Sequence, residues 1–345
     1  MKLLLDKIGS VTKNCGLSQE VEITKNIVCK EGAVIAVKVL EDKKIYNQLE
    51  LVSGRMSTLK KGDVIAVALG NRRALKGFVG KVPETLAPGD TINILNLGGV
   101  AGICTSENVK EVGHALKGKV LGAIVNPKNP GEPLNIKQFT LFSLKDKLTT
   151  NVPLIIVSGT CMNVGKTSAA SEVIKHASRA GKKVVAAKLS GVAALKDTEN
   201  MRDYGAKNVV SFVDAGFTST VDSKQSVGIT KGAIEYLASF KPDYIVIEFG
   251  DGVFGEYGVM DALKDKEIQK LIAVHIGCAH DPMGAAKLVQ VCKEIGAPVD
   301  LISGPVTDNS VGMEFIRTML SVVAINALTS GEQLFEYLTT TCLKK

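Results

Sequence analysis

The chain lacks several features that mark particular classes of protein. Trp is absent and aromatic residues make up only 5% of the 345 residues, which argues against the aromatic-rich surfaces that bind single-stranded nucleic acid or glycans. No block of about five or six like charges occurs, so there is no tail typical of nucleic-acid binding. No apolar run approaches the length of a membrane span. We therefore expect neither a nucleic acid nor a membrane as a partner.

Cysteine is present but shows no pattern of disulfide or metal chemistry. The chain has 7 Cys, an odd number, and none of them form a C-x-x-C pair. The first residues contain too short an apolar run for a signal peptide. Free thiols in a reducing compartment fit this usage best, so we expect a cytoplasmic protein.

The composition is otherwise that of an ordinary globular protein. The chain is 45% hydrophobic and 22% charged, and its length suits two domains, each with its own core. The formal net charge of +7 is modest. It fits an anionic ligand such as a nucleotide, and equally a surface that is merely basic.

Residues 1–150 are predicted to form a small, mainly-β domain, either a barrel or a sandwich. Short β-branched runs at 33–40, 63–69, 91–95 and 120–125 are separated by turn signals such as Lys61-Gly62-Asp63 and Pro88-Gly89-Asp90. Many short strands at this spacing are typical of such folds. A turn-rich segment at 126–133 and a connector to about 151 end this half.

Residues 151–345 show a different period, which predicts an α/β domain with a mostly parallel sheet. Apolar runs of strand length alternate with longer helical patterns, as in βαβ units. Strands are expected at 153–158, 183–188, 209–213, 244–248, 271–276 and 299–303, and helices at 166–179, 229–239, 283–295, 312–327 and 332–343.

A phosphate-binding loop follows the first of these strands. Its residues are Gly159, Thr160, Cys161, Met162, Asn163, Val164, Gly165, Lys166 and Thr167, and Ser168 follows in the helix that opens at Lys166. Backbone N–H groups of the loop and helix N-terminus point at phosphate oxygens. Gly165 allows close approach, Lys166 places a cation on the phosphates, and the Thr167 hydroxyl ligates Mg²⁺. The first glycine lies one residue earlier than in the usual Gly-x-x-x-x-Gly-Lys-Thr spacing.

The loop resembles that of the dethiobiotin synthetase group of P-loop NTPases, whose usual form is Gly-Thr-x-x-x-Val-Gly-Lys-Thr. The resemblance covers roughly residues 152–310 and does not extend to residues 1–150. It implies MgATP as the nucleotide, and no Asn-Lys-x-Asp guanine-reading motif is present. The early lysine of MinD-type ATPases is missing, because Cys161 and Met162 occupy that part of the loop. This argues against their dimer-sandwich switch.

The resemblance also implies roles for residues at later strand ends. Lys188 corresponds to the family's second catalytic lysine, which with Lys166 stabilises the transferred phosphoryl group. Glu248 ends an apolar strand on the Mg²⁺ side, and hard cations prefer such oxygen ligands. Asp203 is the best counterpart of the family's Mg²⁺-linked aspartate, with Asp197 close behind. Asn309 is the candidate for reading adenine.

Other residues near the expected site each have more than one interpretation. His275, Cys278 and His280 suit a zinc site only weakly, since strand alternation separates their side chains, so substrate contact or packing is favoured. Asp251 is either a second carboxylate of the site or part of a glycine-rich turn. Cys161 is either a redox-sensitive thiol at a helix N-terminus or a residue that shapes the loop.

Three functions remain open from the sequence. The first is an ATP-dependent ligase or phosphoryl-transfer enzyme that acts on an unidentified small carboxylate or carbamate. The second is a nucleotide-dependent switch or maturation NTPase that acts on a protein partner through residues 1–150. The third and weakest is a P-loop relative whose ligand only positions another reaction. The sequence does not give the oligomeric state, and a homodimer is left open.

Overall fold

The computed structural model describes residues 1–221 and 224–343, which form two compact units. Unit 1 comprises Met1–Leu141, Val192–Lys196 and Phe212–Val221. Unit 2 comprises Phe142–Gly191, Asp197–Ser211 and the described residues 224–343. The sequence predicted two contiguous domains, whereas two segments from the second half of the chain belong to unit 1.

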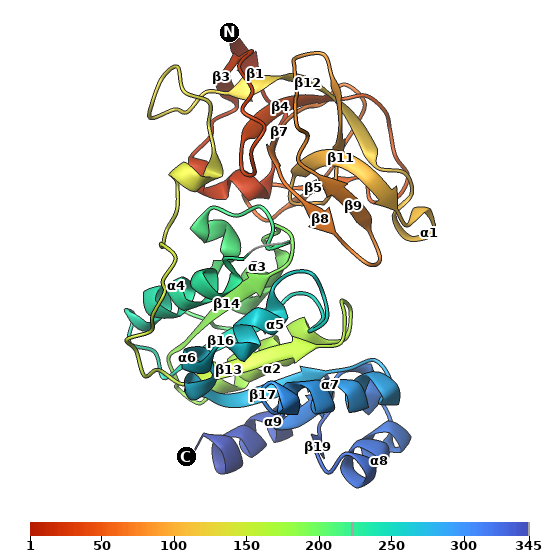
Figure 1. Cartoon of the computed structure of the whole chain (residues 1–345), viewed down its shortest axis with the longest axis vertical. Helices are drawn as coiled ribbons and strands as arrows, with labels where there is room; N and C mark the ends of the chain where they lie inside the picture. Colours follow the sequence, from red (N-terminus) through yellow and green to blue (C-terminus); the bar gives the residue numbers. More distant parts are fainter. Residues whose placement is uncertain (222–223, 344–345) are drawn as a thin grey trace. The chain divides into compact units, whose positions relative to one another are not determined.

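Unit 1 contains a closed barrel of five strands (Figure 1). The strands are β4 (Val34–Val39), β7 (Val64–Leu69), β10 (Thr91–Ile94), β11 (Val100–Glu107) and β12 (Leu116–Ile124). Pairing runs from β10 through β12, β4, β7 and β11 and returns to β10, with only the β7–β11 pair parallel. Closure leaves these strands without an unpaired edge. Of the barrel and sandwich that the sequence predicted, unit 1 is therefore a barrel.

The barrel is stabilised by side chains that alternate along its strands. In β12, Leu116 and Val120 are buried while Lys117 and Lys119 are exposed, which is the two-residue period of a sheet with one solvated face. The inward side chains form one core cluster with Ile35, Ile65 and Ile92. The other elements of unit 1 are β1 (Lys2–Leu4), β2 (Lys7–Ile8), η1 (Ser10–Cys15), β3 (Glu20–Thr24), β5 (Gln48–Glu50), β6 (Met56–Thr58), β8 (Arg72–Arg73), β9 (Phe78–Lys81), α1 (Val109–Val112), η2 (Ile136–Gln138) and η3 (Phe212–Ala215).

Unit 2 is built on a parallel sheet of seven strands in the order β15-β14-β16-β13-β17-β18-β19. Their bounds are β13 (Leu154–Gly159), β14 (Val184–Ser190), β15 (Val209–Ser211), β16 (Tyr244–Phe249), β17 (Ile272–Cys278), β18 (Leu301–Ser303) and β19 (Val323–Ala324). All residues of β13 are buried, as expected for a central strand covered on both faces. The predicted α/β fold class with a preceding mainly-β part is confirmed.

Helices lie on both sides of this sheet (Figure 1). They are α2 (Lys166–Arg179), α3 (Lys196–Asp203), α4 (Ser226–Ala238), α5 (Val259–Lys264), α6 (Lys266–Leu271), α7 (Pro282–Glu294), η4 (Pro305–Thr307), α8 (Ser310–Met319), α9 (Gly331–Tyr337) and η5 (Leu338–Cys342). On one face, α2 and α9 share a core cluster with alternate residues of the central strands, such as Ile155 and Val157.

The predicted helix over 312–327 is wrong in its second half. Helix α8 ends at Met319, Ser321 has a φ of 54°, and the chain continues as the edge strand β19. The apolar run from Val322 to Ile325 fits a helical pattern and a buried parallel strand equally well. Pairing of β19 with β18 decides between the two.

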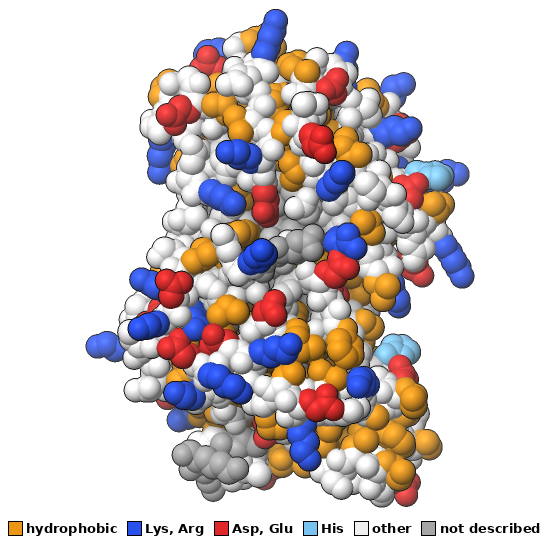
Figure 2. Space-filling model, viewed as in Figure 1, with side chains coloured by type: hydrophobic (Ala, Val, Ile, Leu, Met, Phe, Trp, Pro, Cys, Tyr) orange, Lys and Arg blue, Asp and Glu red, His pale blue; other side chains and the backbone are white. Residues whose placement is uncertain are grey.

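Lys and Arg side chains are interspersed with Asp and Glu over the face drawn in Figure 2. Within residues 1–221 and 224–343, no helix is both long enough and apolar enough to cross a membrane.

Candidate functional site: the loop between β13 and α2

The loop between β13 and α2 owes its path to two glycines. Gly159 ends β13, where a Cβ would come within 2.8 Å of the carbonyl oxygen of Cys278 on β17. Gly165 precedes α2 with a φ of +87°, a left-handed conformation that favours glycine. The loop therefore folds back over the strand ends and leaves the first N–H groups of α2 without helical partners, as at every helix start.

Lys166 begins α2 and points back into the loop. The residue is 4% exposed, and its Nζ donates a hydrogen bond to the carbonyl oxygen of Cys161 at 2.5 Å. Burial lowers the pKa of Lys166, and the nearby Lys188 lowers it further. An anion placed in the loop would relieve both effects.

Thr167 faces the end of the neighbouring strand β16. Register between β13 and β16 sets Glu248 opposite Val157, and the Thr167 hydroxyl donates to Oε1 of Glu248 at 2.9 Å. Glu248 is 1% exposed, and its other oxygen, Oε2, has no hydrogen-bond partner among the described residues. A buried carboxylate oxygen without a partner is costly unless a ligand satisfies it.

Lys188 lies between two carboxylates at the same edge of the sheet. It is level with Glu248 in the β14–β16 pair, and its Nζ is 2.6 Å from Oε1 of Glu248 and 2.7 Å from Oδ2 of Asp197. Burial would lower the pKa of Lys188, but the Asp197 and Glu248 charges outweigh it and the pKa lies above its usual value. Lys188 is therefore held as a cation beside Thr167.

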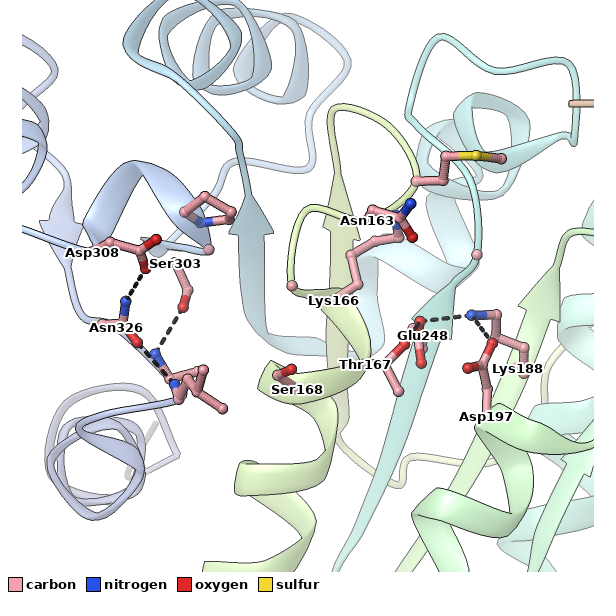
Figure 3. Close-up of a pocket in the computed structure, with 17 residues that line it drawn as sticks. Asn163, Lys166, Thr167, Ser168, Lys188, Asp197, Glu248, Ser303, Asp308 and Asn326 are labelled. Atoms are coloured by element: carbon pink, nitrogen blue, oxygen red, sulfur yellow. Dashed lines mark hydrogen bonds and ion pairs between the residues drawn. The ribbon is translucent and has the colours of Figure 1, made fainter. Parts of the chain in front are cut away.

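These side chains line one end of a cavity of about 580 Å³ in unit 2. Figure 3 shows Lys188, Asp197 and Glu248 on one side of Lys166 and Thr167, with Ser303, Asp308 and Asn326 on the other. The lining residues are Met162, Asn163, Gly165, Lys166, Thr167, Ser168, Lys188, Asp197, Glu248, Gly250, Ser303, Gly304, Pro305, Asp308, Asn326, Ala327 and Leu328. The cavity thus extends from the carboxylate end across the start of α2 to the loops after β18 and β19.

The structure brings most of the predicted site residues together. Lys166, Thr167, Ser168, Lys188 and Glu248 line the cavity, as do Met162, Asn163 and Gly165. The remaining loop residues, Gly159, Thr160, Cys161 and Val164, are not among the lining residues.

Two predicted residues lie elsewhere. Asp203 is exposed at the C-terminal end of α3. Asp197, near the N-terminal end of the same helix, lines the cavity instead. Asn309 caps α8 by accepting hydrogen bonds from the amides of Val311 and Gly312, and it does not line the cavity. Asp203 as a metal ligand and Asn309 as an adenine contact therefore have no support from the geometry.

Several lining residues are not among those predicted from the sequence, and Asp308 and Asn326 are two of them. Asp308 immediately precedes Asn309, so the sequence predicts the loop that reaches the cavity but not the residue of that loop that lines it. Asn326 follows an apolar run that the sequence predicts to be helical. In the structure this run contains the strand β19, and Asn326 lines the cavity just after that strand.

The other residues considered do not form a metal site. His275 is fully buried, with Nε2 2.7 Å from the Ser158 hydroxyl and Nδ1 2.9 Å from the carbonyl oxygen of Ala297. Burial lowers the pKa of His275 and raises that of Cys278 to about 12, while His280 is exposed. No group of three or more His, Cys, Asp or Glu residues suited to a metal ion occurs in the described part of the chain.

Comparison with known proteins shows only distant likenesses. No family model matches the chain, and no curated protein is similar to it in sequence. A chloroplast FtsY from Physcomitrella patens is 13% identical over 56% of this chain and 70% of its own, with a TM-score of 0.39. A DUF1611 family protein from Anabaena variabilis is 13% identical over 62% and 66% of the two chains, with a TM-score of 0.41.

A third likeness is to the hydrogenase maturation factor HypB from Archaeoglobus fulgidus, 15% identical over 55% of this chain and 89% of that one, with a TM-score of 0.36. The chain spans 61% and 53% of the length of two further FtsY structures, from Mycoplasma mycoides and Elizabethkingia anophelis.

The assignment of the fold rests on the chain's own geometry. A central parallel strand, a glycine-bearing loop and a helix beginning with Lys166 and Thr167 stand beside a strand that ends in Glu248. Such a fold implies a nucleotide with Mg²⁺ and leaves the choice between ATP and GTP open. Unit 2 has the fold of a P-loop NTPase.

Proposed function

We propose that unit 2 binds the Mg²⁺ complex of a nucleoside triphosphate, hydrolyses it slowly, and acts as a nucleotide-dependent switch or maturation NTPase on a protein partner. The observation that carries the nucleotide part is the buried Glu248 carboxylate, which meets the Thr167 hydroxyl beside the glycine loop while its Oε2 has no partner among the described residues.

The loop supplies the groups that a triphosphate needs. The N–H groups at the start of α2 and the helix dipole favour the phosphates. Lys166, now hydrogen-bonded to the carbonyl of Cys161, would turn to the β- and γ-phosphates. Because burial lowers the pKa of Lys166, pairing with phosphate stabilises its cationic form.

The residues beside the loop fit Mg²⁺. Thr167 Oγ1 and the unsatisfied oxygen of Glu248 are hard oxygen donors, and Mg²⁺ completes its shell with phosphate oxygens and waters. Bound Mg²⁺ would neutralise charge on the β- and γ-phosphates. Lys188 would then exchange its bond to Glu248 for one to the γ-phosphoryl group that is transferred to water, where it stabilises the developing negative charge.

The switch part is supported by the segment that connects Lys188 to Asp197. Residues Val192–Lys196 belong to unit 1, where the Glu50 carboxylate accepts hydrogen bonds from the amides of Leu195 (2.6 Å) and Lys196 (2.8 Å). The next residue in the chain, Asp197, forms the ion pair with Lys188. A change in that pair on nucleotide binding would therefore act on Asp197, which directly follows this segment of unit 1 in the chain.

The proposal is tested by measuring nucleotide turnover of the purified full chain. We expect Mg²⁺-dependent binding, slow basal hydrolysis that a panel of small carboxylic acids and amines leaves unchanged, and loss of binding in Lys166→Ala. Lys175→Ala, on the same helix and paired only to Glu172 and the Tyr204 ring among the described residues, is the matched control.

Two results would contradict the proposal. Absence of Mg²⁺-dependent nucleotide binding would remove its basis. Turnover that requires a particular small acid or amine would favour the ligase or phosphoryl-transfer function that the resemblance to dethiobiotin synthetase implies.

A further inference from the structure

We infer that the site selects guanine nucleotides, because the Asp308 carboxylate is placed to accept hydrogen bonds from N1–H and the 2-amino group of guanine. This inference rests on the proposed nucleotide binding and names the base that the sequence left as adenine by resemblance. It concerns the end of the cavity formed by the loops after β18 and β19.

The cavity has a phosphate end and a base end. Thr167, Glu248 and Lys188 mark the position of Mg²⁺ and the terminal phosphate, since they supply the oxygen ligand and the cation. A nucleotide with its triphosphate in the loop must then extend past the start of α2 toward the opposite end. That end is lined by Ser303, Gly304, Pro305, Asp308, Asn326, Ala327 and Leu328 (Figure 3).

Asp308 is held in place at this end. It follows the short helix η4 and its backbone N–H donates to the carbonyl of Pro305 at 3.0 Å. Its Oδ1 accepts a hydrogen bond from Nδ2 of Asn326 at 2.9 Å. The residue itself is exposed at the cavity, so a ligand can reach the carboxylate.

The orientation of Asn326 is fixed by its own backbone contacts. Asn326 is 6% exposed, and its Oδ1 accepts from the amides of Leu328 at 3.0 Å and Thr329 at 3.1 Å. The amide nitrogen must therefore point at Asp308. This buried side chain presents one hydrogen to Asp308 and has a second hydrogen to donate.

The polar groups at this end match guanine better than adenine. A carboxylate accepts hydrogen bonds only, and guanine offers it two adjacent donors, N1–H and the 2-amino group. Adenine offers one donor, the 6-amino group, and places the N1 lone pair beside it. The second Asn326 hydrogen suits the O6 or N7 acceptor of guanine. Pro305 and the exposed side chain of Leu328 supply apolar surface for the ring.

The test is competition binding on the full chain with fluorescent guanine nucleotide, displaced by MgGTP, MgATP or the Mg²⁺ complex of xanthosine triphosphate. Because hydrogen bonds to a charged group contribute roughly 1.5–3 kcal/mol, we expect GTP to bind about 10- to 100-fold more tightly than ATP. Asp308→Asn should weaken GTP by a similar factor and strengthen the xanthine nucleotide, since xanthine has a carbonyl where guanine has its amino group and the new amide can donate to it.

Glu314→Gln is the matched control, since it removes an exposed carboxylate of α8 that does not line the cavity. We expect it to leave all three affinities unchanged. Tighter binding of ATP than of GTP by the wild-type protein, or unchanged GTP and xanthine affinities in Asp308→Asn, would overturn the inference while nucleotide binding stands. Failure of every nucleotide to bind would instead contradict the proposed function and this inference with it.

Discussion

Replacing Lys188 by Met tests the charge arrangement at the phosphate end. The substitution keeps the length of the side chain and removes the cation that lies 2.6 Å from Glu248. Glu248 is 1% exposed and would become a buried charge that has lost its ion-pair partner, which costs about 3–5 kcal/mol. For a domain of roughly 150–250 residues, this corresponds to a fall in Tm of about 6–20 °C. The loss of the pair with Asp197, whose side chain is 30% exposed, adds little.

The same variant should respond more strongly to nucleotide than the wild type does. In the wild-type protein, Lys188 on Oε1 already balances part of the Glu248 charge when Mg²⁺ binds at Oε2. In Lys188→Met, Mg²⁺ supplies the missing positive charge, so saturating Mg²⁺–nucleotide should raise Tm by more than in the wild type. Turnover should fall, because the cation that stabilises the leaving phosphoryl group is gone. Differential scanning calorimetry with and without Mg²⁺–nucleotide measures both shifts.

Two comparisons make the result decisive. Lys175→Met removes a partly exposed lysine that pairs with Glu172 on α2 at 2.8 Å, and such pairs contribute at most about 1 kcal/mol. The double variant Lys188→Met/Glu248→Gln should recover much of the lost stability, since the buried side chain at 248 is then neutral. A Tm for Lys188→Met within about 2–4 °C of the wild type, or nucleotide shifts equal in the two proteins, would refute the reasoning.

Three further predictions concern single positions. Gly165→Ala should cost about 1–2 kcal/mol in urea unfolding and weaken nucleotide binding, because Gly165 has a φ of +87° and its loop carries the phosphate-facing amides. Burial holds the pKa of His275 below its ordinary value, so the unfolded chain binds a proton there more readily than the folded chain does. The free energy of unfolding should therefore be highest above about pH 6.5 and fall as the pH drops below that value. His275→Gln should flatten this pH dependence in urea titrations. Asp203→Asn should leave the Mg²⁺ dependence of turnover unchanged, whereas Asp197→Asn should alter turnover through Lys188; a changed Mg²⁺ requirement in Asp203→Asn would restore that residue as a ligand.

The sequence alone predicted the parts of the site that depend on local chain chemistry. A buried strand, a glycine-bearing loop and a helix are contiguous, so Lys166 and Thr167 could be located from spacing. Lys188 and Glu248 end strands of a parallel sheet, and the carboxyl ends of such strands meet at one edge. The loop after β18 was also found, although Asp308 and not Asn309 faces the cavity.

The tertiary structure decided what depends on pairing between distant segments. Closure of the β10–β12–β4–β7–β11 ring distinguishes a barrel from a sandwich, and alternation along single strands is the same in both. The strand β19 brought Asn326 to the cavity because it pairs with β18, although its apolar pattern also fits a helix.

The local sequence is therefore enough to predict the phosphate loop, because the backbone conformation of a loop and the start of a helix depend on adjacent residues. The membership of Val192–Lys196 in unit 1 and the choice of Asp197 over Asp203 were determined by contacts across the fold. Those contacts depend on which residue of a helix turn or loop faces the sheet edge. A polar stretch of sequence does not show which of its side chains that is.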